Sequence, residues 1–334
     1  MARAALVIQT SFLGDVVLTT PLLSQLATRG PVDVVTTPAG GALLESHPAV
    51  RNVVRYDKRG AQQGVSGLRA LGASLRHEQY GAAYLAQGSW RSAALAWLAH
   101  IPVRVGFNTS AGRLLYTEQI AYRPDWHHAE RLYRLANVDP LTPAPAPSLL
   151  PRDEDRAAVT ALLATAPFGR APFIVLAPGS VWATKRWPFY AELLASLPAA
   201  YGIVVAGGAD DRELAAAIVA AAPDRVLSAT GTLALLASAE LIGRAAAVIT
   251  NDSLTQHLAS AMATPTVTVF GPTLPAFGFG PLAPRHAIVE HAPGLDCRPC
   301  SAHGPQRCPR THFRCMRDIS PATVAAALQP LLSD

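Results

Sequence analysis

The chain has 334 residues, of which 50% are apolar and 15% are charged, a composition that excludes a disordered or fibrous protein. Its length allows two domains that each bury a core. Lysine plus arginine number 28 against 23 aspartate plus glutamate, a net charge of +5. This excess suits an anionic ligand or membrane surface, and it is too small for a nucleic-acid-binding protein.

The N-terminal run MARAALVIQT lacks the length and the cleavage site of a signal peptide, so it is expected to be the buried first strand of a cytoplasmic protein. No apolar run in the sequence reaches the roughly 18 residues of a membrane span.

Short apolar runs alternate with alanine- and leucine-rich helical stretches through the first half of the chain. The expected strands are Ala5–Thr10, Val32–Thr37, Val50–Tyr56, Ala82–Gln87 and Val103–Phe107. The expected helices include Thr20–Ala27, Gly67–Arg76 and Arg91–His100. Because the strands are apolar throughout, both faces of their sheet should be covered, which indicates a parallel, doubly wound α/β sheet.

The alternation stops at residues 138–152, VDPLTPAPAPSLLPR, whose five prolines predict a stiff extended linker. It then resumes, with expected strands at Phe173–Ala177, Gly202–Ala206, Arg225–Ser228, Ala247–Thr250 and Thr266–Phe270. The expected helices are Asp153–Ala166, Phe189–Leu197, Arg212–Ala221, Leu233–Ile242, Leu254–Met262 and Ala322–Leu332. The sequence therefore predicts two Rossmann-like domains, over 1–150 and 151–319, with a C-terminal helix over 320–334. Their parallel sheets are expected to face one another across a cleft.

The first expected strand leads into the loop Thr10-Ser11-Phe12-Leu13-Gly14-Asp15, placed where doubly wound sheets bind ligands. Gly14 is expected to allow a tight turn, with Asp15 where a helix begins. Asp15 has two interpretations. It either caps that helix or serves as a carboxylate that accepts a proton from a substrate hydroxyl.

The loop after Phe173–Ala177 reads PGSVWATKRWP. Ser180 and Thr184 offer hydroxyls, while Lys185 and Arg186 place two cations beside an expected helix N-terminus. Cations there oppose the helix dipole, so they predict a bound anion such as a diphosphate. The alternative is an ordinary solvated loop with Trp187 in the core.

The loop after Ala247–Thr250 carries Asp252 and Ser253, with His257 one helical turn further on. Backbone N–H groups and Ser253 can hold phosphate, and a carboxylate and an imidazole can bind sugar hydroxyls. Capping would explain Asp252 and Ser253 but not His257. Thr273, at the end of the last expected strand, is placed to face the same ligand.

Neither the dinucleotide motif G-x-G-x-x-G nor a P-loop occurs in the sequence, which counts against a nicotinamide enzyme. The three loops together predict a nucleotide diphosphate on the C-terminal domain and a polar acceptor beside Asp15. This combination fits a two-Rossmann glycosyltransferase.

Five motifs, in order and over essentially the whole chain, resemble those of the lipopolysaccharide heptosyltransferases of glycosyltransferase family 9. They are QTSFLGDVVLTTP, APGSVWATKRWP, TNDS with a following His, FGPT, and CRPC with the cysteines after it. The heptosyltransferase II-like group is the most similar. The resemblance implies a GT-B fold and an inverting, metal-independent transfer of heptose from ADP-heptose to the lipopolysaccharide inner core.

By motif match, the resemblance makes Asp15 the general base on the N-terminal acceptor domain, with Ser11 and Gly14 in the same acceptor-side loop. Lys185 would contact the donor diphosphate on the C-terminal domain, which makes it the second catalytic residue. The remaining residues expected around the donor are Ser180, Thr184, Thr232, Leu233, Asp252, Ser253 and His257. The sequence departs from the family where Leu254, Thr255 and Gln256 precede that histidine.

The four cysteines all lie in the segment 295–318: Cys297, Cys300, Cys308 and Cys315. The first pair has the C-x-x-C spacing of a zinc site, and His303 and His312 lie among them. The alternatives are reduced thiols or one disulfide. The family's chemistry needs no metal cofactor, so an ion here would be a structural Zn²⁺.

Two other functions remain open at this point: a sugar-nucleotide 2-epimerase with the same two-Rossmann layout, and a non-catalytic nucleotide-sugar binding protein. For the transferase, the expected partners are the ADP-activated sugar, the inner-core acceptor and, through surface arginines, the inner face of the cytoplasmic membrane.

Overall fold

The computed structural model describes residues 3–139, 141–292 and 294–333. The chain divides into two compact units, Met1–Leu150 and Pro151–Asp334. Within the described ranges, no helix combines the length and the apolar character needed to span a bilayer. Five residues lie outside the described ranges: Met1, Ala2, Pro140, Pro293 and Asp334. Met1 and Ala2 belong to the predicted N-terminal strand, and Asp334 belongs to the predicted C-terminal helix.

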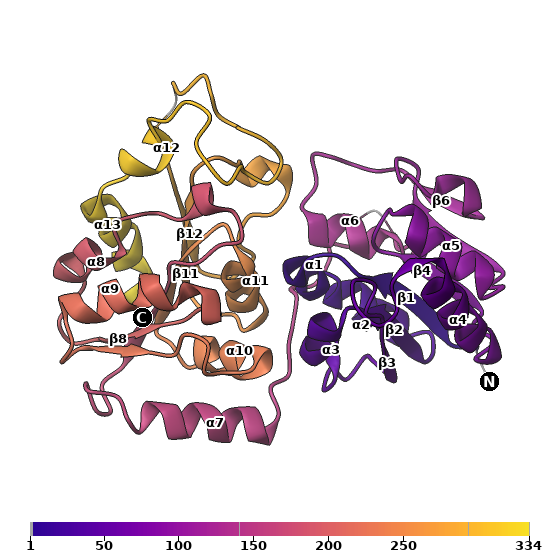
Figure 1. The fold of residues 1–334 in the computed structure, drawn as a ribbon, viewed down its shortest axis with the longest axis horizontal. Coiled ribbons are helices and arrows are strands. Elements are labelled where there is room, and N and C mark those ends of the chain that lie inside the picture. Colours follow the sequence, from indigo (N-terminus) through magenta and orange to yellow (C-terminus); the bar gives the residue numbers. More distant parts are fainter. Residues whose placement is uncertain (1–2, 140, 293, 334) are drawn as a thin grey trace. The chain divides into compact units, whose positions relative to one another are not determined.

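The first unit contains a six-stranded, all-parallel sheet in the order β3-β2-β1-β4-β5-β6 (Figure 1). Its strands are β1 (Ala5–Gln9), β2 (Val32–Thr36), β3 (Asn52–Arg55), β4 (Ala82–Leu85), β5 (Val103–Phe107) and β6 (Glu118–Ile120). Its helices are α1 (Leu13–Leu18), α2 (Thr20–Ala27), α3 (Pro38–Leu44), α4 (Gly64–His77), α5 (Trp90–Leu98) and α6 (His128–Arg134), with a 3₁₀ turn at Arg113–Leu115.

Helices cover both faces of this sheet. One face packs against α4 and α5 in a cluster that includes Leu6, Leu85, Leu75 and Leu95. Helices α1, α2, α3 and α6 pack against one another, and α2 also contacts β2. The central strand β1 is buried over almost its whole length, as its uninterrupted apolar sequence predicts.

The second unit repeats this arrangement, with the parallel order β12-β11-β10-β7-β8-β9. Its strands are β7 (Phe173–Ala177), β8 (Gly202–Val205), β9 (Val226–Ser228), β10 (Ala247–Asn251), β11 (Thr266–Phe270) and β12 (His286–Glu290). Its helices are α7 (Asp153–Leu163), α8 (Tyr190–Leu193), α9 (Arg212–Ala221), α10 (Leu235–Gly243), α11 (Leu254–Ala261), α12 (Arg314–Arg317) and α13 (Pro321–Leu332). The 3₁₀ turns are Ala183–Lys185, Leu194–Ser196, Ala209–Asp211 and Pro275–Phe277.

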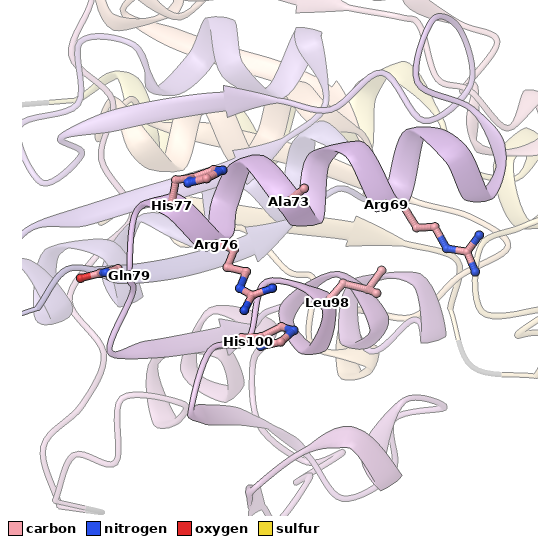
Figure 2. A pocket seen from close by; sticks show the side chains of 7 residues that line it. All are labelled: Arg69, Ala73, Arg76, His77, Gln79, Leu98 and His100. Carbon is pink, nitrogen blue, oxygen red and sulfur yellow. The ribbon is translucent and has the colours of Figure 1, made fainter.

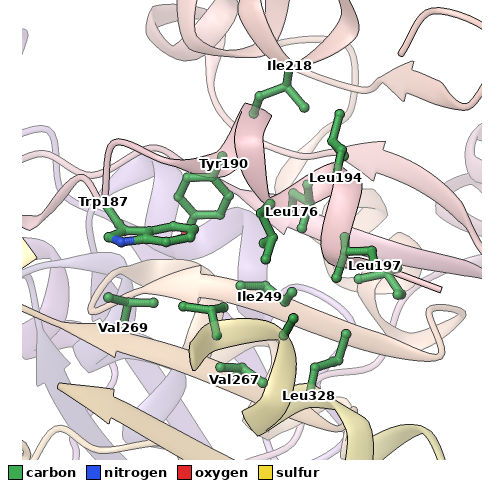
Figure 3. Close-up of a cluster of buried hydrophobic side chains, with 14 of the residues drawn as sticks. Leu176, Trp187, Tyr190, Leu194, Leu197, Ile218, Ile249, Val267, Val269 and Leu328 are labelled. Atoms are coloured by element: carbon green, nitrogen blue, oxygen red, sulfur yellow. The ribbon is translucent and has the colours of Figure 1, made fainter. Parts of the chain in front are cut away.

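The core of the second unit joins the sheet to α8, α9 and α13, as Figure 3 shows. Trp187 and Tyr190 lie at one end of it, with their rings 5.2 Å apart and nearly perpendicular. The indole Nε1 of Trp187 donates to the carbonyl of Ile319 at 3.0 Å. Trp187 is therefore a core residue, as the alternative interpretation of its loop expected, and it anchors the end of that loop.

The predicted α/β class and two parallel doubly wound sheets are confirmed, and the predicted strands differ from the observed ones by no more than two residues at either end. Two edge strands, β6 and β12, have no counterpart in the prediction. The sequence Glu118–Ile120 is short and polar, and His286–Glu290 mixes charged and apolar residues, so neither has the uninterrupted apolar run of a central strand.

Residues 141–152 form no helix or strand, as the prolines predict, and the chain divides into its two units at Leu150/Pro151 within this segment. The backbone N–H of Ala144 donates to Glu130 at 2.7 Å, and that of Ser148 donates to Thr20 at 3.0 Å. Hydrogen bonds to α2 and α6 thus hold this part of the linker on the first unit. The C-terminal helix also belongs to a unit: α13 packs on β11 and β12, with Ser320 capping its N-terminus.

The strand order determines where the loops of interest lie. In each sheet the order reverses between two neighbouring central strands, β1 and β4 in the first and β7 and β10 in the second. Crossover connections leave these strands in opposite directions, so the loops at their carboxyl ends diverge and leave room for a ligand. Asp15 follows β1, Lys185 follows β7 and Asp252 follows β10.

Candidate active site

Asp15 lies in the first turn of α1, at the carboxyl end of β1. It does not cap the helix, because α1 begins at Leu13 with Phe12 in the capping position and no side-chain cap. Gly14 is the second residue of α1, so the expected tight turn at this glycine is also wrong. The Ser11 hydroxyl donates to Asp15 Oδ2, and its oxygen also lies 2.9 Å from Gln9 Oε1. The Asp15 carboxylate is thus held by its own loop.

His128 is the residue of this site that the sequence interpretation missed. It opens α6, and its Nε2 lies 3.7 Å from Asp15 Oδ1. The two side chains are only 15% and 18% exposed. The pair His127-His128 before an amphipathic helix was the available signal, but 113 residues separate His128 from Asp15, and no short-range pattern reveals such a pairing.

Burial lowers the pKa of His128, and this effect outweighs the raising effect of the Asp15 carboxylate, while Arg131 lowers the pKa further. The imidazole is therefore neutral at neutral pH, and it faces the Asp15 carboxylate as a polar neighbour without forming a full ion pair. An unprotonated histidine leaves the carboxylate free to accept a proton from elsewhere.

Beside the Asp15 loop, a hollow of about 310 Å³ is lined by Lys58, Arg59, Gln87, Ser89 and Arg91. Lys58 Nζ donates to the carbonyl of Thr10 at 2.6 Å, which joins this hollow to the start of the Asp15 loop. Burial lowers the pKa of Lys58, and Arg59 and Arg91 lower it further because their charges repel its own. Three like charges gathered around one hollow favour an anionic ligand.

In the second unit, Lys185 and Asp252 form a buried ion pair with Nζ and Oδ2 2.6 Å apart. Lys185 ends a 3₁₀ turn after β7, and Asp252 directly follows β10. The pair therefore joins the two strands between which the order of this sheet reverses. The helix expected from Phe189 begins at Tyr190 as α8, and the Lys185 charge is balanced by Asp252, a partner that the sequence interpretation did not identify.

Three further side chains complete the surroundings of Asp252. Thr273 Oγ1 donates to Oδ2 at 2.7 Å, and Gln256 Nε2 donates to Oδ1 at 3.2 Å and to the carbonyl of Phe279 at 2.8 Å. His257 Nε2 lies 3.5 Å from the same amide nitrogen. Gln256, which departs from the family pattern, is therefore part of this group.

The other expected donor residues have mostly local roles here. Ser253 is the N-cap residue of α11 without a side-chain cap, and its hydroxyl lies 3.2 Å from that of Thr250. The Ser180 hydroxyl accepts from the backbone N–H of Trp182 at 3.4 Å. Thr232, in the loop after β9, donates to the carbonyl of Ala229 at 2.8 Å, and the half-buried Leu233 follows it.

The cysteine-containing segment fastens the two loops that hold Asp252. On one side Thr184 donates to the carbonyl of Pro305, and the backbone N–H of Ala183 donates to Gln306 at 3.1 Å. On the other side the backbone N–H of Cys300 donates to the carbonyl of Pro272 at 2.9 Å. The Trp182 and His303 rings also stack, 6.0 Å apart. The segment thus acts as a brace across the Lys185 and Thr273 loops.

The four cysteines are reduced, with Cys315 buried and the others half-buried. Burial, together with the smaller effect of the neighbouring thiols, raises the pKa of Cys315 to about 11. Cys297 Sγ lies 3.7 Å from His312 Nε2. Among the described residues, no group of three or more His, Cys, Asp or Glu side chains is arranged to hold a metal ion, so the structural zinc ion stays a prediction.

The two units offer complementary chemistry. The second unit presents a cation, a carboxylate and hydroxyls at its strand reversal, groups that suit a sugar joined to a diphosphate. The first unit presents a carboxylate beside a cationic hollow. Two doubly wound domains with such loops define the class of nucleotide-sugar glycosyltransferases with two Rossmann-like domains.

Comparison with known proteins identifies the family. The family model for glycosyltransferase family 9 (heptosyltransferase) matches residues 68–305, more than half of the chain, and the chain belongs to this family. It is 28% identical to lipopolysaccharide heptosyltransferase 2 of Salmonella typhimurium over 98% of both chains. It is 30% identical to lipopolysaccharide heptosyltransferase 2 of Escherichia coli K12 over 85% of this chain and 87% of that one.

The structure of E. coli ADP-heptose lipopolysaccharide heptosyltransferase II superposes with a TM-score of 0.80 at 26% identity, covering 99% of this chain and 98% of that one. The chain is therefore a glycosyltransferase with the fold of this group. The comparisons give no support to an epimerase or to a non-catalytic binding protein.

The buried ion pair gives a prediction about stability. Lys185→Met leaves the Asp252 carboxylate buried without its cation, which should cost about 3–5 kcal/mol of unfolding free energy. Urea unfolding measures the loss, and the double variant Lys185→Met/Asp252→Asn should recover part of it. Arg314→Met, which removes an exposed ion pair to Asp318, serves as the control and should cost about 0.5 kcal/mol or less. Equal losses for Lys185→Met and Arg314→Met would contradict the assignment of a buried pair.

His128 gives a prediction about pH. Because its pKa is lowered in the folded state, the unfolded chain binds more protons below about pH 6.5. The folded protein should therefore lose stability as the pH falls from 6.5 through the lowered pKa. His128→Gln should lose less over that interval, as measured by Tm at a series of pH values. His47→Gln is a matched positive comparison and should also reduce the loss, because burial lowers the pKa of His47 as well. A His128→Gln profile parallel to the wild-type profile would show that His128 does not titrate in this way.

Proposed function

We propose that this protein transfers heptose from ADP-heptose to a sugar of the lipopolysaccharide inner core, with inversion and without a catalytic metal ion. Membership of glycosyltransferase family 9 and similarity to heptosyltransferases along nearly the whole chain support the reaction class. The observation that carries the proposal is the group around Asp252, in which a lysine, a threonine and a glutamine converge on one carboxylate at a strand reversal.

The donor is assigned to the second unit. Lys185 would contact the diphosphate, with Ser180, Thr184, Ser253 and His257 nearby, and Thr232 and Leu233 would line the adenine. A carboxylate has about four acceptor positions. Asp252 uses three of them for Lys185, Thr273 and Gln256, which leaves capacity for a heptose hydroxyl.

The acceptor is assigned to the first unit, and Asp15 is its general base. Ser11 fixes one carboxylate oxygen, and neutral His128 faces the other, so the carboxylate is oriented without being neutralised by a full positive charge. The hollow lined by Lys58, Arg59 and Arg91 would bind the anionic groups of the inner core.

The mechanism follows from these roles. Asp15 removes the proton from the acceptor hydroxyl as that oxygen attacks the anomeric carbon, and the C–O bond to the diphosphate breaks on the opposite face. Lys185 stabilises the negative charge that develops on the departing ADP, which supplies the electrostatic role that a divalent ion has in other enzymes. Turnover requires the Asp15 carboxylate to come within hydrogen-bond reach of the acceptor while the donor is bound.

The acceptor is a lipid-linked molecule, so the enzyme is proposed to be a cytoplasmic protein that contacts the inner membrane peripherally. The cysteine segment is proposed to have a structural role through its contacts with the donor loops. If it binds Zn²⁺, elemental analysis of the purified protein will find one ion per chain, and the ion would hold the brace together.

Asp15→Asn tests the general base. The amide keeps the shape of the side chain but cannot take up the proton, so turnover should fall by at least roughly 100-fold. ADP affinity, measured by isothermal titration calorimetry, should remain nearly unchanged. Asp125→Asn, at an exposed carboxylate of the same unit, should leave both values intact. An equal loss of ADP affinity in Asp15→Asn would assign Asp15 to the fold or the donor site.

Arg59→Ala and Arg91→Ala test the acceptor hollow. Each removes a charged donor for an acceptor anion, so the KM for the core oligosaccharide should rise about tenfold while the KM for ADP-heptose stays constant. Arg113→Ala, at an exposed arginine of the same unit, is the control. A rise in the donor KM instead would place the nucleotide sugar in the first unit.

A further inference from the structure

One face of the first unit combines exposed cations with exposed large apolar side chains. It is formed by α4 and α5 and is called here the α4–α5 surface, comprising Val65, Arg69, Arg76, Trp90, Trp97 and His100. None of these residues belongs to the acceptor hollow or to the Asp15 loop.

The centre of this surface is a hollow of about 600 Å³ between the two helices (Figure 2). Arg76 from α4 points toward His100 at the end of α5, and Arg69 lies two turns earlier along α4. The lining also includes His77, and none of its seven residues is acidic. In the described part of the chain, no ion pair links Arg69 or Arg76 to a carboxylate. The hollow therefore carries uncompensated positive charge.

Part of this charge has a local explanation, because cations are favourable near the C-terminal ends of helices. Arg76 and His77 lie in the last turn of α4, and His100 follows the end of α5. The helix dipole does not account for Arg69 in the middle of α4. It also gives no reason for the exposed large apolar side chains on the same two helices.

Trp90 and Trp97 are 53% and 54% exposed, and Val65 is 62% exposed. The two tryptophans are seven residues apart on α5 and so share one face of the helix. Val65, Arg69 and Arg76 are likewise spaced to share one face of α4. Helices α4 and α5 pack against one another, so the two packed helices carry both exposed arginines and exposed tryptophans. This combination binds at a membrane interface, where the ring enters the headgroup region and the cation meets phosphate.

Helix α5 also connects this surface to the proposed acceptor site. Arg91 lines the acceptor hollow, and Leu98, seven residues later on the same face, lines the hollow of the α4–α5 surface. At 1.5 Å per residue the two positions are about 10 Å apart along the helix. A lipid anchored at one end of α5 can thus present its sugars at the other end.

We propose that the α4–α5 surface docks onto an anionic phospholipid bilayer. This inference rests on the proposed function for its purpose, since a lipid-linked acceptor gives the enzyme a reason to approach a membrane. The surface itself is defined by exposure and charge alone. A protein partner with an acidic patch is the competing occupant, and the tryptophans spread along α5 favour a bilayer over it.

Vesicle sedimentation with the purified full chain tests the docking surface. The chain should sediment with mixed phosphatidylglycerol–phosphatidylcholine vesicles, bind vesicles of phosphatidylcholine alone much more weakly, and be released as salt rises. The variant Arg69→Glu/Arg76→Glu should lower the partition coefficient by roughly tenfold or more. Trp90→Ser/Trp97→Ser should lower it as well, through loss of apolar contact.

The control is Arg170→Glu/Arg310→Glu, which makes the same charge change at two exposed arginines of the second unit. It should bind vesicles nearly as the wild type does. Equal loss in the control would show that net charge, not this surface, causes binding. Failure of the wild type to bind anionic vesicles, or wild-type binding by the arginine variant, would overturn the proposal and leave an acidic protein as the occupant to seek.

Transfer to a delipidated core oligosaccharide separates this proposal from the proposed function. Arg69→Glu/Arg76→Glu should keep the wild-type rate on that soluble acceptor, because neither arginine belongs to the proposed active site, and an unchanged Tm would show that the variant is folded. If no heptose is transferred by any form of the protein, the proposed function fails while the vesicle result still stands.

Discussion

The placement of every site residue depends on one constraint, the reversal of strand order inside each parallel sheet. Between β1 and β4, and again between β7 and β10, neighbouring strands send their connections to opposite faces of the sheet. The backbone at those carboxyl ends has no covering helix directly above it, so polar side chains can gather there without disturbing the core. Asp15, Lys185 and Asp252 all lie at these positions, in two sheets with the same order.

Within the second unit, the Lys185–Asp252 pair shows how such a position is stabilised before any ligand arrives. A lysine and an aspartate that are each buried would be costly alone, and their 2.6 Å contact with the added hydrogen bond from Thr273 offsets that cost. The cysteine segment limits the movement of the Lys185 loop through Thr184 and of the Thr273 loop through Pro272. The charges are therefore held in a fixed arrangement, which electrostatic catalysis requires.

The sequence was sufficient for features that depend on local pattern. Uninterrupted apolar runs marked the central strands, and Ser320 with the following proline marked the start of α13. Features created by long-range contact were not predictable in this way. The neighbour of Asp15 is His128, far along the chain, and the partner of Lys185 is Asp252, and neither pairing was predicted from the sequence. The edge strand β12 escaped notice because partial exposure removes the apolar signal.

Gln256 illustrates how a departure from a family pattern can be interpreted physically. Its side chain is fully buried, and its amide nitrogen bridges the Asp252 carboxylate and the carbonyl of Phe279. An apolar side chain has no N–H group with which to make that bridge, so here the orientation of Asp252 Oδ1 depends on Gln256. The departure therefore acts on the carboxylate assigned to the donor sugar and not on the cation assigned to the diphosphate. In the proposed mechanism, Gln256 would therefore influence the choice of sugar through Asp252 and leave the contact of Lys185 with the diphosphate unaffected.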